Sequence, residues 1–140
     1  MTDYLQPTDI SIYIGHSLQI QTFLGKKELL GLKGNKAIVE IGRFFIHYIN
    51  LTQVKPFVRP LDQLTKKIKH NDVCFVPFNI LKAYNYIGYH FNVEEEQLKY
   101  IIENDQLDMG KMPYWMVNLC AGWHFDIRNL LNKQLANELI

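Results

Sequence analysis

The sequence predicts an α+β protein in which an N-terminal antiparallel meander packs against C-terminal helices. Residues 18–59 alternate short apolar or aromatic stretches with Gly and Asn turns, and after Pro60 the hydrophobic period lengthens. The composition, with 48% hydrophobic and 21% charged residues, is typical of a folded globular chain. At 140 residues the chain has the usual length of one domain. We therefore expect a single domain, residues 1–140, with a strand-rich half (18–59) and a mostly helical half (60–140).

The strand-rich half reads as a series of short strands with tight connections. Residues 18–24 (LQIQTFL) alternate in the manner of a half-buried strand, and further strands are expected at residues 27–33, 36–41, 43–49 and 54–59. Turns are expected at Gly25-Lys26, Gly34-Asn35 and residues 50–53. Pro56 has no N–H to donate, which predicts that the last strand lies at a sheet edge. Such a meander predicts a small barrel or a strongly bent sheet.

After Pro60 the pattern favours helices. Asp62 is expected to cap a short helix that buries Leu64 and Ile68, and residues 73–76 form a strand. Residues 78–91 fit either a helix or a strand, and Asn92 begins a clearer helix. The last helix is expected over residues 113–136.

Charge is distributed unevenly along a chain whose net charge is only +1. Residues 26–82 contain eleven Lys and Arg against four Asp and Glu, whereas residues 94–140 contain four basic and eight acidic residues. The molecule therefore has a basic and an acidic segment, which bears on its partners rather than on its fold.

The sequence matches no common catalytic or metal-binding motif, and we expect no catalytic residue, no metal site and no cofactor. Cys120 and His124 are four residues apart, a spacing that lets an imidazole activate a thiol, but Cys120 falls on the apolar stripe of the expected helix. We expect it to be an inert buried residue, with a cysteine-dependent enzyme as an alternative. The histidines are scattered, and the glycines match no phosphate-binding loop.

Basic residues interleaved with aromatic residues point to nucleic-acid binding as another function. Many single-strand binders combine lysines that neutralise phosphates with aromatic rings that stack on bases. The candidate contacts are Lys26, Lys27, Lys33, Lys36, Arg43, Lys55 and Arg59. The competing interpretation is that these lysines only solvate the sheet and protect its edges.

Two segments resemble a known group of proteins. VKPFVRPLDQLTKKI with the following HND and FVPF, and MPYWMVNLCAGWHFDIRNLLNKQLA near the C-terminus, are similar to segments of small uncharacterised proteins encoded by phages and prophages of Bacteroidota. The chain departs from that pattern at Gly122, where the relatives have an acidic residue. The resemblance implies a role inside an infected or lysogenic bacterium. Our leading prediction is a non-enzymatic inhibitor of a bacterial defence system, of the anti-CRISPR type, that binds an RNA-guided nuclease or its guide complex.

The predicted partner-binding surface lies on the last helix and the acidic stretch before it. Helical geometry places one group of residues opposite the buried Trp123 face, and an acidic group would complement a basic target. These residues are Tyr114, Ala121 and Phe125, with Glu94, Glu95, Glu96, Asp105 and Asp108. The alternative is that the strand-rich half covers Tyr114 and Phe125.

The N-terminal sequence MTDYLQPTD lacks the basic and apolar pattern of a signal peptide, and no apolar run is long enough to cross a bilayer. We expect a protein of the bacterial host cytosol with two free cysteines, Cys74 and Cys120, and no membrane contact.

Overall fold

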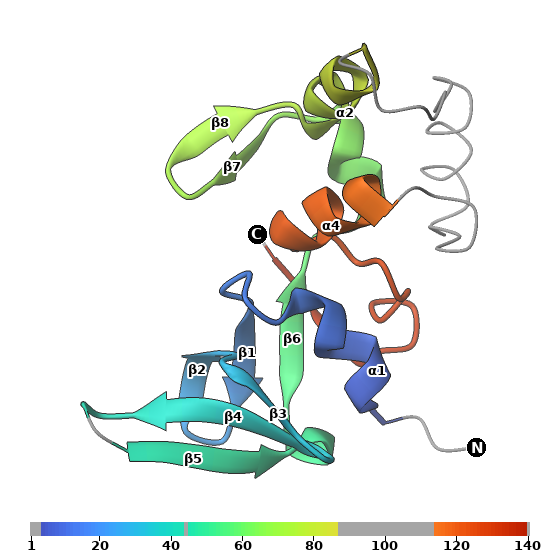
Figure 1. The fold of residues 1–140 in the computed structure, drawn as a ribbon. Coiled ribbons are helices and arrows are strands. Elements are labelled where there is room, and N and C mark those ends of the chain that lie inside the picture. The colour runs from blue at the N-terminus through green and yellow to red at the C-terminus, as the bar shows by residue number, and fades with distance from the viewer. Residues whose placement is uncertain (1–3, 44, 87–113, 140) are drawn as a thin grey trace.

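The computed structural model describes residues 4–43, 45–86 and 114–139, and confirms an α+β fold with an antiparallel meander (Figure 1). The meander contains β1 (Gln19–Thr22), β2 (Gly25–Glu28), β3 (Gly31–Lys33), β4 (Lys36–Ile41), β5 (Phe45–Asn50) and β6 (Lys55–Val58). The expected turn at Gly34-Asn35 is present, whereas the first turn lies at residues 23–24 rather than at Gly25-Lys26.

The meander is divided between two sheets. The first sheet has the order β2-β1-β6-β9, in which the short β9 (Asn137–Glu138) runs parallel to β6, and the second sheet has the order β3-β4-β5. The single strand expected over residues 27–33 is divided at Leu29 and Leu30, which lie between β2 and β3. The N–H of Leu29 donates to the carbonyl of Leu18, just before β1, and the N–H of Leu30 donates to the carbonyl of Ile38 in the second sheet. One continuous segment therefore serves both sheets, which form a bent meander and not a closed barrel.

The prediction that Pro56 marks an edge strand is wrong. In the first sheet β6 lies between β1 and β9, and Pro56 is paired with Ile20 of β1. On the other side β9 pairs only with Phe57 and Val58. Because the short β9 starts beyond Pro56, the missing N–H does not interrupt that ladder.

The remaining described elements are short. They are α1 (Pro7–Ile10), the 3-10 helices η1 (Ser11–Tyr13), η2 (Leu51–Gln53) and η3 (Leu61–Thr65), the hairpin of β7 (Ile68–His70) and β8 (Val73–Phe75), α2 (Pro77–Tyr86) and α4 (Tyr114–Gly122).

The helix expected after Asp62 is only the 3-10 turn η3. Its N-cap residue is Pro60 rather than Asp62, and the chain returns to strand at Ile68. Asn71 and Asp72 both have positive φ, a conformation that these residues tolerate and that suits a two-residue hairpin turn.

The long last helix expected over residues 113–136 is wrong, because α4 ends at Gly122. The N–H of His124 donates to Ala121 O and the N–H of Phe125 donates to Cys120 O, which is the hydrogen-bond pattern of a Schellman motif. His124 has a φ of 64° at the position where glycine is usual. The periodicity of the apolar residues continues past this point, but the helix does not.

Buried residues of both halves form one hydrophobic cluster. Ile20 and Val58 contribute from the first sheet, Val39 from the second, and Met116 and Phe125 from the C-terminal segment. The helix predicted from Asn92 lies outside the described residues. No helix within the described ranges is long and apolar enough to span a membrane.

Candidate functional site

The second sheet places two lysines of the predicted nucleic-acid set directly opposite each other. Lys33 of β3 pairs with Lys36 of β4, and both side chains are exposed. Directly paired residues of an antiparallel ladder lie on the same face, and like charges in such a pair are destabilising. The Lys33 ammonium lies 5.2 Å from the ring centroid of Tyr48 on β5. This end of the second sheet therefore combines two positive charges with an aromatic ring.

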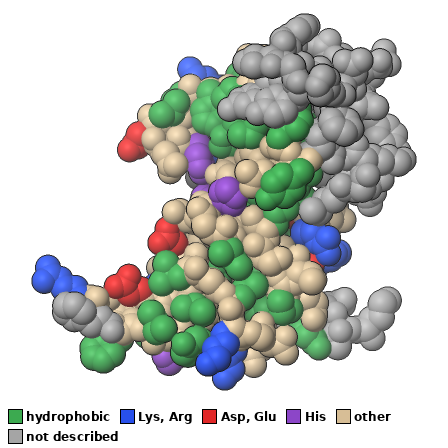
Figure 2. Space-filling model, viewed as in Figure 1, with side chains coloured by type: hydrophobic (Ala, Val, Ile, Leu, Met, Phe, Trp, Pro, Cys, Tyr) green, Lys and Arg blue, Asp and Glu red, His purple; other side chains and the backbone are tan. Residues whose placement is uncertain are grey.

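The β4–β5 hairpin also exposes large apolar side chains. Phe45 is 73% exposed and Ile46 56%, and Phe23, in the turn between β1 and β2, meets the ring of His47 at 6.3 Å between centroids. Arg43 lies in the hairpin turn and is exposed. Figure 2 shows hydrophobic and basic side chains along the lower border of this face, where Figure 1 shows β4 and β5. We call Lys33, Lys36, Arg43 and Tyr48 the hairpin surface. Phe45 and His47 alternate with Tyr48 along β5 and lie on the opposite face of the sheet.

A second basic group lies on the outer face of the first sheet. Lys26 of β2 and Lys55 of β6 flank Gln21 of β1 in one row, and the Lys26 ammonium lies 4.4 Å from the ring centroid of Phe57. The two sheets turn their buried faces toward one core, so this group and the hairpin surface lie on different outer faces. Lys27 pairs with the buried Ile20 and is half-buried. The predicted basic residues thus form two groups rather than one patch.

Arg59 does not belong to either group, and its predicted contact with nucleic acid is wrong. The side chain is only 7% exposed, and its guanidinium donates to Trp123 O at 3.0 Å and to Lys69 O at 2.9 Å. A third guanidinium contact reaches His70 Nδ1 at 3.4 Å. Arg59 follows β6 into the space between the end of α4 and the β7–β8 hairpin, where it connects backbone segments.

Around this guanidinium the structure builds a joint, formed by Arg59, His70, Trp123 and His124, which we call the Arg59 joint. The rings of His70 and His124 meet edge to face at 4.9 Å between centroids. The ring of His124 donates to His16 O at 2.6 Å. The backbone N–H of Arg59 donates to His124 O, which fixes the end of β6 to the end of α4.

The histidines of the Arg59 joint are held in their neutral form. Burial lowers the pKa of His124 below its ordinary value, the hydrogen bond to His16 O opposes this shift, and the positive charge of Arg59 lowers the pKa further. Burial and the charge of Arg59 likewise lower the pKa of His70. The contacts of the Arg59 joint are therefore made by uncharged imidazole rings.

Cys120 and His124 do not form a thiolate and imidazole pair. Cys120 is fully buried, as predicted, and burial raises its pKa to about 12. Because α4 ends between the two residues, helical i, i+4 geometry does not apply, and the His124 ring is engaged with His16 O. At neutral pH the thiol stays protonated.

The predicted partner surface on the last helix is not assembled. Tyr114 is 78% exposed, but Ala121 and Phe125 are completely buried. Phe125 lies beyond the helix end and forms an isolated bridge with Arg59 of the strand-rich half, so the alternative that this half covers it is correct for Phe125. The acidic residues Glu94, Glu95, Glu96, Asp105 and Asp108 lie outside the described residues.

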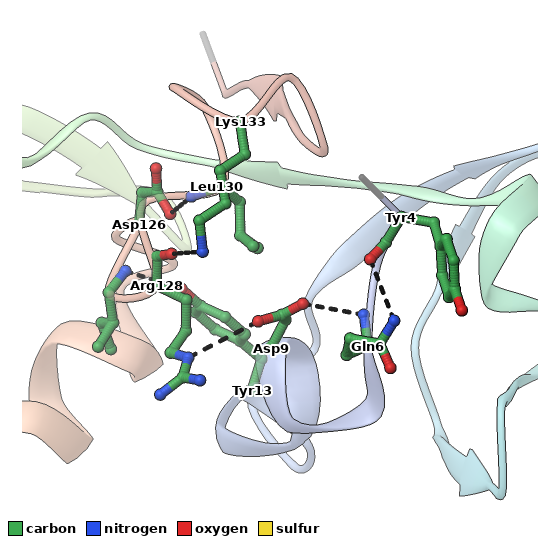
Figure 3. A network of polar contacts seen from close by, with 9 residues as sticks. Tyr4, Gln6, Asp9, Tyr13, Asp126, Arg128, Leu130 and Lys133 are labelled. Atoms are coloured by element: carbon green, nitrogen blue, oxygen red, sulfur yellow. Dashed lines mark hydrogen bonds and ion pairs between the residues drawn. The ribbon is translucent and has the colours of Figure 1, made fainter. Parts of the chain in front are cut away.

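A buried polar network fixes the segment after α4, and sequence analysis did not find it (Figure 3). The carboxylate of Asp126 accepts the N–H groups of Leu130 at 2.7 Å and Leu131 at 2.9 Å. The hydroxyl of Tyr13 donates to Phe125 O and accepts the N–H of Ile127 at 3.1 Å. The sequence shows only an aspartate followed by a turn, and this pattern is too common to predict a buried network.

No metal site is formed by the described residues. They contain no group of three or more His, Cys, Asp and Glu side chains placed to hold a metal ion. A pocket of about 300 Å³ lies beside Pro60 and Leu61, and the Asp126 carboxylate on its wall already accepts two backbone N–H groups.

Comparison with known proteins gives no relative from which function could be transferred. No protein-family model matches the chain, and no curated protein or solved structure shows significant similarity to it. The likeness to phage-encoded proteins stays a prediction. Function is therefore argued from the surfaces of the molecule.

Proposed function

We propose that the protein is a binding protein that holds single-stranded nucleic acid on the outer face of the β3-β4-β5 sheet. The observation that carries the proposal is the direct pairing of Lys33 with Lys36 on an exposed sheet face beside Tyr48. This pairing costs stability in the free protein, because like charges stand opposite each other. A phosphate group bound between the two ammonium groups would remove that cost.

The distribution of charge and rings along the hairpin supports a strand-like ligand. Arg43 lies at the turn, whereas Lys33 and Lys36 lie near the other end of β4. A strand of six residues spans roughly 20 Å, a length that accommodates a few nucleotides. Tyr48, which is 40% exposed and lies on the same face as Lys33 and Lys36, offers a ring on which a base can stack. Aromatic side chains stack on any base, so we expect binding that tolerates many nucleotide sequences.

Salt dependence tests this proposal directly. Neutralising three phosphates on a single strand should give a slope of roughly −2 for log affinity against log salt concentration. Fluorescence anisotropy with a labelled single-stranded oligonucleotide at several salt concentrations measures this slope. Use of the Lys26 and Lys55 face as well would give a steeper slope.

A pair of matched charge reversals distinguishes a site from general attraction. The double variant Lys33→Glu with Lys36→Glu should abolish binding, whereas Lys66→Glu with Lys67→Glu, at two exposed lysines after η3, should leave most of it. If both variants weaken binding equally, the attraction is nonspecific and the hairpin surface is not the site. Absence of binding at low salt would refute the proposal.

Tyr114 favours a second candidate, a phage-encoded inhibitor that binds a host protein such as an RNA-guided nuclease. It is the one residue of the predicted aromatic anchors that is exposed, at 78% in the first turn of α4. Exposed tyrosines are common anchors of protein interfaces. The test is affinity purification of the tagged protein from host cells, with nuclease treatment, followed by the same experiment with Tyr114→Ala. A captured host protein that survives nuclease treatment and is lost in the variant would favour this function.

A further inference from the structure

The outer edge of β5 has no neighbouring strand among the described elements. β5 is the terminal strand of the second sheet, and in Figure 1 it forms the lower border of the molecule. Five of its six residues are exposed, and only Ile49 is buried. An exposed edge strand presents a row of backbone N–H and C=O groups on which another strand can pair.

This edge lacks the features that keep edge strands apart. Natural edges carry charged residues, prolines or bulges that oppose pairing. Residues 44–54 contain no Lys, Arg, Asp, Glu or Pro. Between Arg43 and Lys55, therefore, no formal charge stands along the seam where a second strand would approach.

The sequence of β5 is complementary to itself in one antiparallel register. With His47 paired to His47 of a second copy, Ile46 faces Tyr48 and Phe45 faces Ile49, each pair occurring twice by symmetry. Apolar and aromatic pairs of this kind stabilise antiparallel sheets. In this register the two-fold axis is perpendicular to the sheet, so residues of the same face stay on the same face in both copies.

We propose that β5 pairs with β5 of a second copy of this chain and forms a two-fold symmetric dimer centred on His47. The result is a continuous sheet with the strand order β3-β4-β5-β5-β4-β3. The opposite edge strand, β3, is continuous with β2 of the first sheet, so association through β5 closes at two copies. The partner strand is β5 of a second copy, because every pair from Phe45 to Ile49 in this register joins compatible side chains and no like charges face each other.

This inference goes beyond the proposed function and does not depend on it. Dimerisation would place the Lys33 and Lys36 pairs of both copies on one outer face, but it requires no nucleic acid. The oligomeric state is therefore measured after nuclease treatment and at high salt, where phosphate contacts are weakened.

Sedimentation equilibrium of the full chain tests the dimer. We expect a concentration-dependent mass that rises to twice 16.5 kDa. Ile46→Lys and Tyr48→Glu should each weaken dimerisation about tenfold or more, because symmetry introduces every change twice. The double variant Ile46→Lys with Tyr48→Glu should restore the dimer, since position 46 of one copy then faces the opposite charge at position 48 of the other.

The matched control is Val73→Lys, which adds the same charge at an exposed apolar residue of the β7–β8 hairpin and should leave the dimer intact. Circular dichroism checks that each variant is folded. A chain that stays at 16.5 kDa at the highest concentration overturns the proposal, as does a doubled mass that vanishes on nuclease treatment. A double variant that remains monomeric while folded overturns the His47-centred register, and higher assemblies overturn closure at two.

Discussion

The Arg59 joint and the hairpin surface both contain basic side chains, but the two regions place these side chains in opposite environments. In the joint, Arg59 is 7% exposed and its guanidinium contacts two backbone carbonyls and a histidine. On the hairpin, Lys33 and Lys36 are exposed and stand opposite each other. One region satisfies its positive charge inside the protein, and the other leaves positive charge facing solvent.

The difference shows that position in the sheet, rather than residue type, decides the role of a basic side chain. Val58, just before Arg59, pairs with β9, and Arg59 itself bridges to Phe125, so Arg59 is surrounded on several sides. Among the described strands β5 has a neighbour on one side only, which leaves its other edge open to a partner. Changes in the joint should therefore affect stability, whereas changes on the hairpin should affect binding.

The largest effect is expected for Phe125→Ala beside the joint. Phe125 is completely buried, so truncation should lower the free energy of unfolding by about 3 to 5 kcal/mol through lost burial and a cavity. Urea denaturation measures the change. The matched control is Tyr114→Ala, which should change stability by no more than about 0.5 kcal/mol because Tyr114 is exposed. Equal losses in the two variants would contradict the burial that separates them.

Removal of the Arg59 guanidinium should have the next largest effect. Arg59→Met keeps much of the apolar stem but leaves the carbonyls of Trp123 and Lys69 without their donor, which should cost about 2 to 3 kcal/mol. Lys55→Met, at an exposed position of β6 four residues before Arg59, should leave the free energy of unfolding nearly unchanged. Thermal and urea unfolding of both variants measure the difference, and a neutral Arg59→Met would show that the joint contributes little.

Acid should weaken the joint more than the hairpin. The folded state holds the pKa of His70 and His124 below the ordinary value of about 6.5, so the unfolded chain binds more protons as the pH falls through this range. The stability contributed by the neutral rings is complete above about pH 6.5 and is lost as the pH falls below it. Urea denaturation between pH 8 and pH 5 tests the sign of this dependence.

Histidine variants locate the source of that acid sensitivity. His70→Gln and His124→Gln should each flatten the dependence of the unfolding free energy on pH. Unchanged pH dependence in both variants would show that these two histidines are not its source.

The smallest and most telling effect is expected for Lys36→Glu. An opposite charge facing Lys33 should raise the free energy of unfolding by a few tenths of a kcal/mol, because a repulsive cross-strand pair becomes attractive. The same variant should weaken binding of single-stranded nucleic acid. Lys66→Glu serves as the control and should do neither. A loss of stability in Lys36→Glu would mean that the lysine pair is not a strained arrangement.

The strands of the N-terminal half could be predicted because their signals are local. Residues 36–41 were expected as a strand and form β4, since alternation and the flanking turn residues act within a few positions. Residues 54–59 were also expected as a strand and contain β6, but the place of β6 in the sheet was mispredicted from Pro56. Strand order depends on β9, which comes about 80 residues later in the chain.

The candidate site was predicted in part for the same reason. Alternation identifies exposed lysines such as Lys33 and Lys36, but Arg59 looked the same in sequence as the lysines around it. Its burial follows from contacts with Lys69 and Trp123, which come from other parts of the chain. Likewise, the apolar period after Cys120 predicted a helix that the Schellman motif at His124 ends.

The sequence by itself determined the fold class, several strands of the meander, the burial of Cys120 and the basic character of the strand-rich half, because each follows from composition or from short-range periodicity. The tertiary structure alone decided that Arg59 and Phe125 are internal, that Tyr114 is exposed and that β5 is the terminal strand of its sheet among the described elements. Those properties depend on which distant segments lie side by side, and residues far apart in the chain meet only when the whole core is formed.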